Sequence, residues 1–252
     1  MISRINIDCS VFEYRLLDIL NRYVERNRCE CIALSGGIDT TLIAAIATLN
    51  GIELNGFYAY YVNGIPRDMP YVIYVSKKLN IPAEFISMDL EYIKSALNDV
   101  YRCISKNVYH ELCVELRNDV VFYTVLKVAK EHGCSCIYTG SGGDEVFAGY
   151  GFMLWLPEEE LEGYREKWGV GGRYPEIEMG KCLGVNVVAP YLSKEVLEEA
   201  MKIPARCLRG SGFEGKRILR NILSRFGMEF IGERAKTPAE AGAGTDSICI
   251  TP

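Results

Sequence analysis

The stretch CIALSGGIDTTLIAAI, residues 31–46, changes character three times along its length. An apolar run ends at a Ser-Gly-Gly sequence, an acid and two threonines follow, and a second apolar run begins. A buried strand over 29–34 and a helix over 40–49 account for the two apolar runs. Glycines between them let the chain turn sharply, and free N–H groups at the start of a helix attract an anion. The stretch therefore predicts either an ordinary strand-to-helix turn or an anion site.

Outward from this stretch, strands and helices alternate as far as about residue 150. Further strands are expected over 54–62, 83–88 and 134–138, and helices over 11–25, 69–79, 90–105 and 117–131. Beyond that point helices dominate, with Ser193 placed to cap one and a single apolar stripe over 218–226. Alternating strands and helices imply crossover connections and a parallel sheet. We therefore predict an α/β fold, a parallel twisted sheet with helices on both faces, followed by a mostly helical C-terminal part.

Composition narrows the class of protein. The chain has 252 residues, of which 49% are hydrophobic and 24% charged, as is typical of a globular protein. No apolar run reaches the roughly 18–20 residues that span a bilayer, and the N-terminus lacks the order of a signal peptide. We therefore expect a cytoplasmic protein with no membrane partner. The net charge of −5 argues against nucleic acid as its main partner.

One segment departs from this acidic balance. Between residues 202 and 236 nine basic side chains face only three acidic ones. The segment is either a solvated helix face or an electropositive wall for phosphate.

Ten cysteines are many for a protein of the cytoplasm. Cys29 and Cys31, like Cys134 and Cys136, form C-x-C pairs in predicted strands, so each pair is expected to point to one face of the sheet. Buried free thiols are the favoured interpretation. Intracellular disulfides remain an alternative if the source is a hyperthermophile. A metal site is the weakest alternative, because the usual spacing of zinc ligands is missing.

In a parallel sheet, ligands bind beyond the carboxyl ends of the strands. The first glycine loop emerges at such an end, directly after its strand. A Walker loop would carry a lysine for the terminal phosphates, and here an aspartate, Asp39, stands in the loop instead. A carboxylate beside phosphates repels them unless a cation lies between, so the loop predicts Mg²⁺. Ser-Gly-Gly-x-Asp-Ser/Thr after a first strand resembles the pyrophosphate loop of the PP-loop, or N-type, ATP pyrophosphatases. The resemblance implies an adenine-nucleotide α-hydrolase-like fold that cleaves ATP between its α and β phosphates.

A second loop, YTGSGGDEVFAGY at 138–150, narrows the family. It resembles the S-G-E-G-[AS]-D-E-[LV]-F-G-G-Y segment of the synthetase domain of asparagine synthetases and their β-lactam-forming relatives. The residues in register are Gly140, Gly142, Asp144, Glu145, Phe147, Gly149 and Tyr150. Later segments follow in family order, at 188–204, 215–223 and 232–244.

The resemblance implies a set of site residues. A carboxylate would be adenylated by ATP, and an amine or ammonia would displace AMP. Catalytic roles are expected for Lys236, Asp144 and Glu145, and Mg²⁺ ligation for Asp39 and Asp144. The nucleotide is expected to contact Leu34, Ser35, Gly36, Gly37, Asp39, Thr40 and Gly140. The substrate is expected to contact Ser141, Gly142 and Gly143.

The chain also departs from the family. Its Met1 is followed by Ile2, not by the cysteine nucleophile of a glutaminase domain, so we expect no glutamine hydrolysis in cis. Nitrogen would come from ammonia, a partner subunit or an amine on the substrate. Ser141 stands where asparagine synthetases carry a glutamate that lies beside the aspartyl-AMP and serves the ammonia. Residues 186–188, Asn-Val-Val, replace a Glu-x-Arg. The activating half of the reaction is thus expected to be retained and the acceptor half altered.

These patterns divide the chain into a leading helix (1–26), a PP-loop nucleotide-binding core (27–150), a helical part that completes the site (151–245) and a loose tail (246–252). The leading hypothesis is an AMP-forming amide ligase that uses ATP and Mg²⁺. Two alternatives stay open: a PP-loop enzyme that modifies RNA, and a nucleotide-binding subunit or regulator. A separate nitrogen-donor subunit and a homo-oligomer are possible partners.

Overall fold

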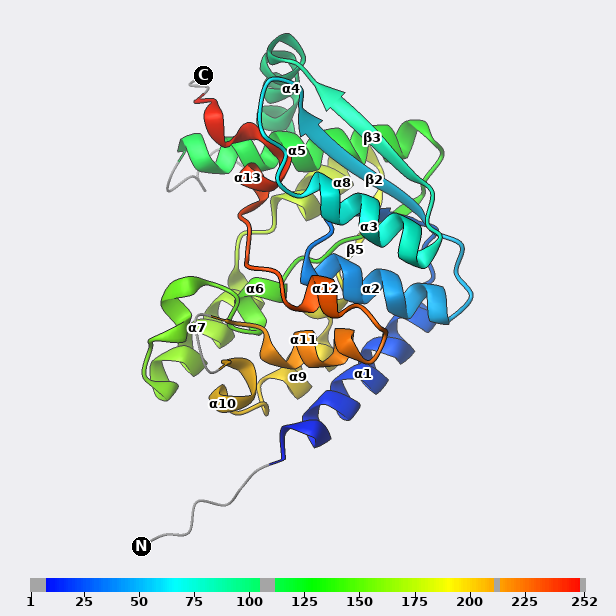
Figure 1. Ribbon diagram of the computed structural model, residues 1–252. Helices are drawn as coiled ribbons and strands as arrows, with labels where there is room; N and C mark the ends of the chain where they lie inside the picture. Colours follow the sequence, from blue (N-terminus) through cyan, green and yellow to red (C-terminus); the bar gives the residue numbers. More distant parts are fainter. Residues whose placement is uncertain (1–7, 105–111, 211–213, 250–252) are drawn as a thin grey trace, which may run out of the picture.

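The computed structural model describes residues 8–104, 112–210 and 214–249. Its centre is one five-stranded parallel sheet in the order β3-β2-β1-β4-β5 (Figure 1). The strands are β1 (Cys31–Ala33), β2 (Asn55–Tyr61), β3 (Ala83–Met88), β4 (Cys136–Tyr138) and β5 (Asn186–Val188). In the centre, Ile32 lies opposite Gly56 on one side and Tyr138 on the other. The α/β fold with a parallel sheet is therefore confirmed.

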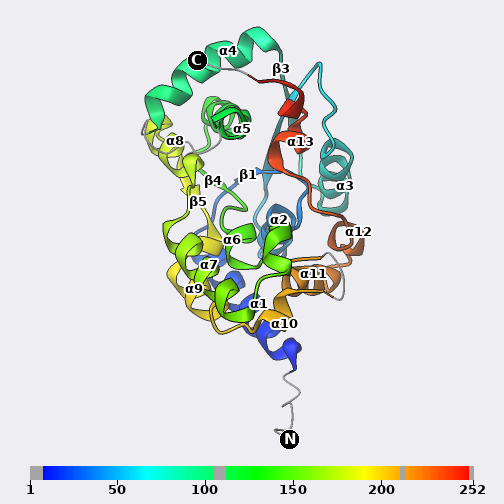
Figure 2. The same cartoon turned by 90° about the vertical axis from the view of Figure 1, so that its left-hand side faces the viewer.

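Helices cover both faces of this sheet (Figure 2). One face packs against α2 (Ile38–Leu49) and α3 (Met69–Leu79), with α1 (Cys9–Arg26) outside α2. The other face packs against α4 (Leu90–Cys103), α5 (Leu112–Glu131) and α8 (Pro175–Leu183). Two separate hydrophobic cores result, one on each side of the sheet.

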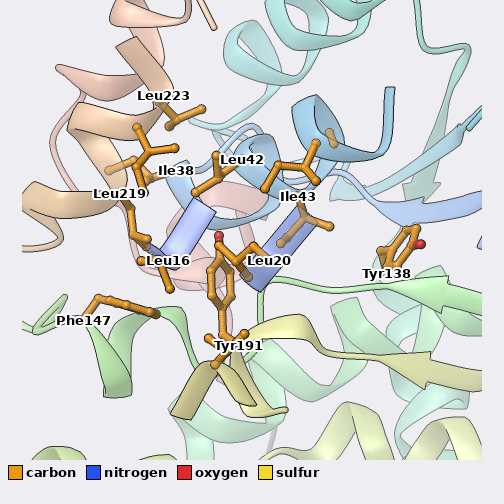
Figure 3. Packing of buried hydrophobic residues seen from close by; sticks show 14 of the residues in the cluster. Leu16, Leu20, Ile38, Leu42, Ile43, Tyr138, Phe147, Tyr191, Leu219 and Leu223 are labelled. Carbon is orange, nitrogen blue, oxygen red and sulfur yellow. The ribbon is translucent and has the colours of Figure 1, made fainter. Parts of the chain in front are cut away.

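The first core joins the two ends of the chain. Helix α11 (Arg217–Ser224) packs against α1 and α2 with Leu219 and Leu223, and Leu16 and Leu20 of α1 meet them (Figure 3). All four leucines are completely buried, and each stabilises the fold by roughly 1.5–3 kcal/mol. This packing holds the C-terminal helices beside the first strand and its loop.

The remaining helices and turns lie mainly in the C-terminal part. They are α6 (Gly143–Val146), α7 (Glu158–Gly171), α9 (Lys194–Ala200), α10 (Ala205–Leu208), α12 (Glu229–Gly232) and α13 (Ala239–Ala243), with 3-10 turns at Gly151–Leu154, Pro190–Leu192 and Thr245–Ser247. Ser193 caps α9 as predicted, accepting a hydrogen bond from the Val196 N–H at 3.4 Å. Strand β5 was not predicted, and it joins the sheet from within the part expected to be helical.

No helix in the described ranges combines the length and the apolar character that crossing a membrane requires.

All ten cysteines are paired, so the expectation of buried free thiols is wrong. The disulfides are Cys9–Cys207, Cys29–Cys136, Cys31–Cys134, Cys103–Cys182 and Cys113–Cys249. Their Cα atoms lie 5.5–6.2 Å apart, the separation that a disulfide spans. Four of the five join residues more than a hundred positions apart, which sequence spacing cannot reveal. The last bond ties Cys249, in the expected loose tail, to α5; residues 250–252 lie outside the described residues.

The two C-x-C pairs also differ from expectation. Cys29 and Cys136 lie in the core beside α1 and α2, whereas Cys31 and Cys134 lie in the core on the opposite face. Cys29 precedes β1 and Cys134 precedes β4, so the alternation of a strand does not extend to them. One disulfide therefore clamps β1 to β4 on each face of the sheet.

Candidate active site

Two glycine loops meet at the carboxyl end of the sheet. Strand order runs outward from β1 to β2 and β3, and in the opposite direction from β4 to β5, so it switches between β1 and β4. The loop after β1 and the loop after β4 therefore emerge side by side at the switch point, where ligands bind in such sheets. They are in close contact: a Cβ on Gly140 would come 2.8 Å from the Cβ of Asp39.

The first loop is shaped for close approach of a ligand to its backbone. Ser35 Oγ lies 2.9 Å from Thr40 Oγ1 and accepts a hydrogen bond from the Gly37 N–H at 3.2 Å. Gly37 is the N-cap of α2 and supplies no side-chain cap, which leaves the start of this helix available to an anion. The side chain of Leu34, in contrast, is buried in the core at 1% exposure.

A buried arginine braces this loop from outside. Arg234 donates to the carbonyl oxygen of Gly36 at 2.8 Å and to Asp68 Oδ1 at 2.5 Å, and its guanidinium lies 3.9 Å from the centre of the Tyr71 ring. Gly36 has φ +64°, and a Cβ there would lie 2.6 Å from the backbone nitrogen of Val72. Only glycine therefore fits between the brace and α3. Arg234 was not assigned a role from the sequence.

Two lysines and two aspartates form the charged centre of the site. Lys216 Nζ lies 2.5 Å from Asp39 Oδ2 and 2.9 Å from Asp144 Oδ1, and Lys236 Nζ lies 2.8 Å from that same Asp144 oxygen. Tyr191 fixes the backbone beside them, donating its hydroxyl to the carbonyl oxygen of Asp39 at 3.0 Å. The four side chains come from α2, the second loop, the residue before α11 and the segment before α13.

Attraction between the lysines and the aspartates keeps these buried side chains charged. Burial lowers the pKa of Lys216, but the carboxylates of Asp144 and Asp39 outweigh burial and raise that pKa above its ordinary value. Burial raises the pKa of Asp144, but the two lysines outweigh burial and hold that pKa at about 2. Burial raises the pKa of Asp39, which contacts one lysine in place of two, so its charge is the less firmly held.

The same aspartates fit a hard cation. Asp39 Oδ1 is buried and has no hydrogen-bond partner among the described residues. Two carboxylates with an orphaned oxygen are what Mg²⁺ uses when phosphates supply its other ligands. Within the described ranges no group of three or more His, Cys, Asp or Glu side chains forms a metal site on its own, so phosphate oxygens would have to complete the coordination.

The second loop carries hydroxyl and carboxyl groups on the side of α8. Ser141 Oγ lies 2.7 Å from Thr139 Oγ1 and donates a hydrogen bond to Glu176 Oε1. Glu145 Oε1 accepts a hydrogen bond from the Tyr150 hydroxyl at 2.5 Å, and burial raises the pKa of Glu145. Gly142 turns the loop with φ +87°, where a Cβ would collide with Leu192. Burial also raises the pKa of Glu176, to about 7.

The predicted residues thus fall into one place, apart from the side chain of Leu34. Three important side chains were missed: Lys216, Arg234 and Glu176. The first two stand in the segments GKRILRNIL and GERAK that carry the family resemblance, so a signal existed for their neighbourhood. The basic segment 202–236 supplies both lysines of the cluster, so it is not only a solvated helix face, and its contact with phosphate stays a prediction. Nothing in the sequence pattern points to Glu176.

Comparison with known proteins gives matches of two kinds. A protein of Methanocaldococcus jannaschii, provisionally named asparagine synthetase (glutamine-hydrolysing) 1, is 23% identical over 256 residues, which cover 86% of this chain and 46% of that protein. The tRNA-specific 2-thiouridylase MnmA 1 of Aliarcobacter butzleri is 26% identical over 113 residues, covering 43% of this chain and 33% of that protein. The chain thus spans less than half the length of the curated relatives it matches.

Among solved structures, NMN synthetase from Francisella tularensis matches with a TM-score of 0.40 and 14% identity, covering 92% of this chain and 99% of that chain. The NH3-dependent NAD synthetase of Campylobacter jejuni matches with a TM-score of 0.37 and 14% identity over the same shares of the two chains. TM-scores this low do not establish a shared fold.

The family model for asparagine synthase matches residues 14–171. The match takes in more than half of the chain and both glycine loops. The chain therefore belongs to the asparagine synthase family, in the PP-loop superfamily of adenine-nucleotide α-hydrolases.

Proposed function

We propose that the chain is an ATP-dependent ligase that forms AMP and pyrophosphate, adenylates a carboxylate and passes the acyl group to ammonia or an amine. The observation that carries this proposal is the cluster of Asp39, Lys216, Asp144 and Lys236 between the two glycine loops. Membership of a family that uses ATP supports it. The identity of the carboxylate is left open, because residues 186–188 differ from the relatives at the expected arginine position.

The first loop would hold the β and γ phosphates. The N–H group of Gly36, with the hydroxyls of Ser35 and Thr40, offers hydrogen bonds before α2, and a phosphate oxygen would replace Ser35 Oγ as the acceptor for the Gly37 N–H. Asp39 and Asp144 would hold Mg²⁺, which when bound neutralises phosphate charge and orients the phosphates for in-line attack. The brace of Arg234 keeps the backbone of the loop in place before the nucleotide arrives.

The lysines would act on the charge that the reaction creates. Attack of a carboxylate on the α-phosphate leaves negative charge on the departing pyrophosphate. Lys216 and Lys236 lie beside the loops that are proposed to hold the phosphates, so they would meet this charge without large movement. Lys216 is held by two carboxylates and is almost fully buried, whereas the Lys236 side chain is one-third exposed. We propose that Lys216 keeps its position during the reaction, whereas the side chain of Lys236 can adjust its position.

Nitrogen supply, partners and location remain proposals. Free ammonia, a separate nitrogen-donor subunit or an amine on the substrate would each supply the nitrogen. A homo-oligomer is compatible with all three, and a cytoplasmic location is proposed.

The 2-thiouridylase matches keep RNA modification as the second candidate function. Against it, sulfur transfer by a protein thiol requires a free cysteine, and all ten are in disulfides. A nucleotide-binding subunit or regulator is the third candidate.

One assay separates these functions. The protein is incubated with α-labelled ATP, Mg²⁺, ammonium and pools of carboxylic acids that include aspartate, and AMP is measured. Carboxylate-dependent AMP is expected. AMP formed only when tRNA is added would favour RNA modification, and nucleotide binding without AMP from any pool would favour the regulator.

A variant tests the role of the lysine cluster. Lys216→Met removes the ammonium but keeps most of the side-chain volume, and we expect AMP formation to fall by about 10²–10³-fold. Asp39→Asn and Lys236→Ala should each reduce it strongly as well. The matched control is Lys194→Met, whose lysine side chain is 88% exposed on α9. Near-normal turnover of folded Lys216→Met, checked by circular dichroism, would contradict the assignment.

A further inference from the structure

The acceptor side of the site contains a carboxylate supplied by another element. Ser141 lies between two glycines of the second loop, and its hydroxyl donates to the carboxylate of Glu176. Glu176 follows Ser141 by 35 residues and lies in the first turn of α8. Helix α8 is held in place against α5 and β5, and a disulfide joins its Cys182 to Cys103 of α4. The carboxylate is therefore fixed on a rigid element and aimed at the loop.

This carboxylate adjoins the activating residues. On either side of Ser141, Gly140 and Gly143 pack so closely on Asp39 that neither has room for a Cβ. The hydroxyl of Ser141 thus lies one residue from the contact between the two loops. An acyl group attached to the α-phosphate at that contact would have Ser141 and Glu176 as neighbours.

The groups around Glu176 are rich in acceptors and poor in donors. Glu176 is 3% exposed, and neither it nor Glu145 forms an ion pair among the described residues. The charge of Asp119 on α5 also acts on Glu176, and Asp119 is itself paired with Arg173 at 2.5 Å. Hydroxyls of Ser141 and Thr139 lie beside it, and Tyr174 lies close enough that burial and the charges of Glu145 and Glu176 raise the pKa of its hydroxyl. Such a set suits a small ligand that only donates hydrogen bonds and carries positive charge, and it repels a carboxylate.

We propose, building on the ligase function proposed above, that Glu176 and Ser141 bind the nitrogen donor as ammonium or a primary alkylammonium, and that Glu176 removes its proton. The freed lone pair attacks the acyl carbon, a C–N bond forms, and the bond from that carbon to the AMP oxygen breaks with its electron pair leaving on AMP. The second nitrogen proton is lost to solvent. Glu176 thereby supplies from α8 the carboxylate that Ser141 lacks on the loop.

Its environment suits a base that works near neutral pH. Burial is the main cause that raises the pKa of Glu176, and the carboxylates of Glu145 and Asp119 add to it, while the hydrogen bond from Ser141 lowers it. A base in this range accepts a proton and releases it again with similar ease. A merely structural carboxyl would keep the same hydrogen bond to Ser141 without needing to ionise, so the two roles differ in what an uncharged replacement does.

The test uses Glu176→Gln, which keeps the shape and a partner for Ser141 but cannot ionise. Adenylation is followed by carboxylate-dependent exchange of labelled pyrophosphate into ATP, without any nitrogen donor. Transfer is followed as amide formed from ammonium, and as hydroxamate formed from hydroxylamine, which is largely unprotonated at neutral pH. Glu178→Gln, which replaces an exposed carboxylate on the same helix, is the matched control.

We expect Glu176→Gln to keep exchange within about twofold, to lose ammonium-dependent amide formation by about 10²–10⁴-fold, and to lose far less hydroxamate formation. The double variant Ser141→Glu/Glu176→Ser returns the carboxylate to the loop. Its ammonium-dependent amide formation should exceed that of Glu176→Gln by at least about tenfold. This double variant also tests the proposal if Glu176→Gln fails to fold.

Three outcomes would overturn the proposal. Ammonium-dependent turnover of Glu176→Gln within about threefold of wild type would show that no base is needed there. An equal loss with ammonium, with hydroxylamine and in the exchange would indicate a structural role. Absence of carboxylate-dependent exchange in the wild-type protein would instead remove the ligase function, and this inference with it.

Discussion

Glu176 changes its protonation at a pH where the unfolded chain does not. Burial raises its pKa from 4.5 to about 7, so between these values the folded protein holds a proton that the unfolded chain releases. Because the folded state binds the extra proton, the free energy of unfolding decreases as pH rises through this window and is level above it. A pKa difference of one between the folded and unfolded states corresponds to about 1.4 kcal/mol, which gives a total on the order of 3 kcal/mol.

This linkage predicts how Glu176→Gln behaves in urea. The glutamine cannot ionise, so the difference in unfolding free energy, variant minus wild type, should increase between pH 4.5 and 7 by up to about 3 kcal/mol. Urea titrations of both proteins at several pH values measure it. A difference that stays constant with pH would mean that Glu176 titrates in the folded protein as it does in the unfolded chain.

The contact between α6 and α2 aligns the two loops. Gly143, the first residue of α6, packs on the carboxyl group of Asp39, and a Cβ there would lie 2.9 Å from Oδ2 and closer still to the carboxyl carbon. Gly143→Ala should displace that carboxylate and reduce AMP formation by on the order of 10²-fold, as a shift of about 1 Å in an active site can do.

The matched control for that change is Gly163→Ala. Gly163 lies in α7 with open space at its Cβ position, so alanine should leave AMP formation unchanged and raise stability by about 0.5–1 kcal/mol. Equal activity of the two variants would show that the Asp39 carboxylate tolerates displacement.

At the scale of elements, sequence periodicity was a good guide where segments were long. The expected bounds of 69–79 and 83–88 coincide with α3 and β3, and both glycine loops lie where predicted. Strand β5 has three residues, too few for an alternating pattern, and the glycine-rich sequence before α8 concealed that helix. Lys216 and Glu176 join the site through contacts with residues 177 and 35 positions away, which no local pattern encodes.

Over the whole molecule the disulfides replace the free thiols expected from the sequence. Their partners lie 79–198 residues apart, so each bond restricts a long loop in the unfolded chain, which typically stabilises by about 2–4 kcal/mol. A location that keeps these bonds oxidised is therefore required. The proposed cytoplasmic location holds only for a cell that maintains intracellular disulfides.

Reduction tests this account. Protein purified without reductant and then unfolded should show no reactive thiol, and ten after treatment with a phosphine reductant. Losing the cross-links should lower Tm by more than about 10 °C, given roughly 2–4 °C for each kcal/mol in a chain of this size. Thiol counting and thermal melts measure both quantities. Ten thiols before reduction, or an unchanged Tm after it, would contradict the five bonds.

The ion pair between Lys216 and Asp39 joins two segments that are synthesised at different times. A nascent chain leaves the ribosome from its N-terminus, so the two aspartates emerge long before Lys216, which follows Asp39 by 177 residues. Helix α1 packs on α2, which follows it directly, but its contacts with α9 and α11 form only after those later helices have been made. Asp39 and α1 are thus made well before the segments that complete their contacts.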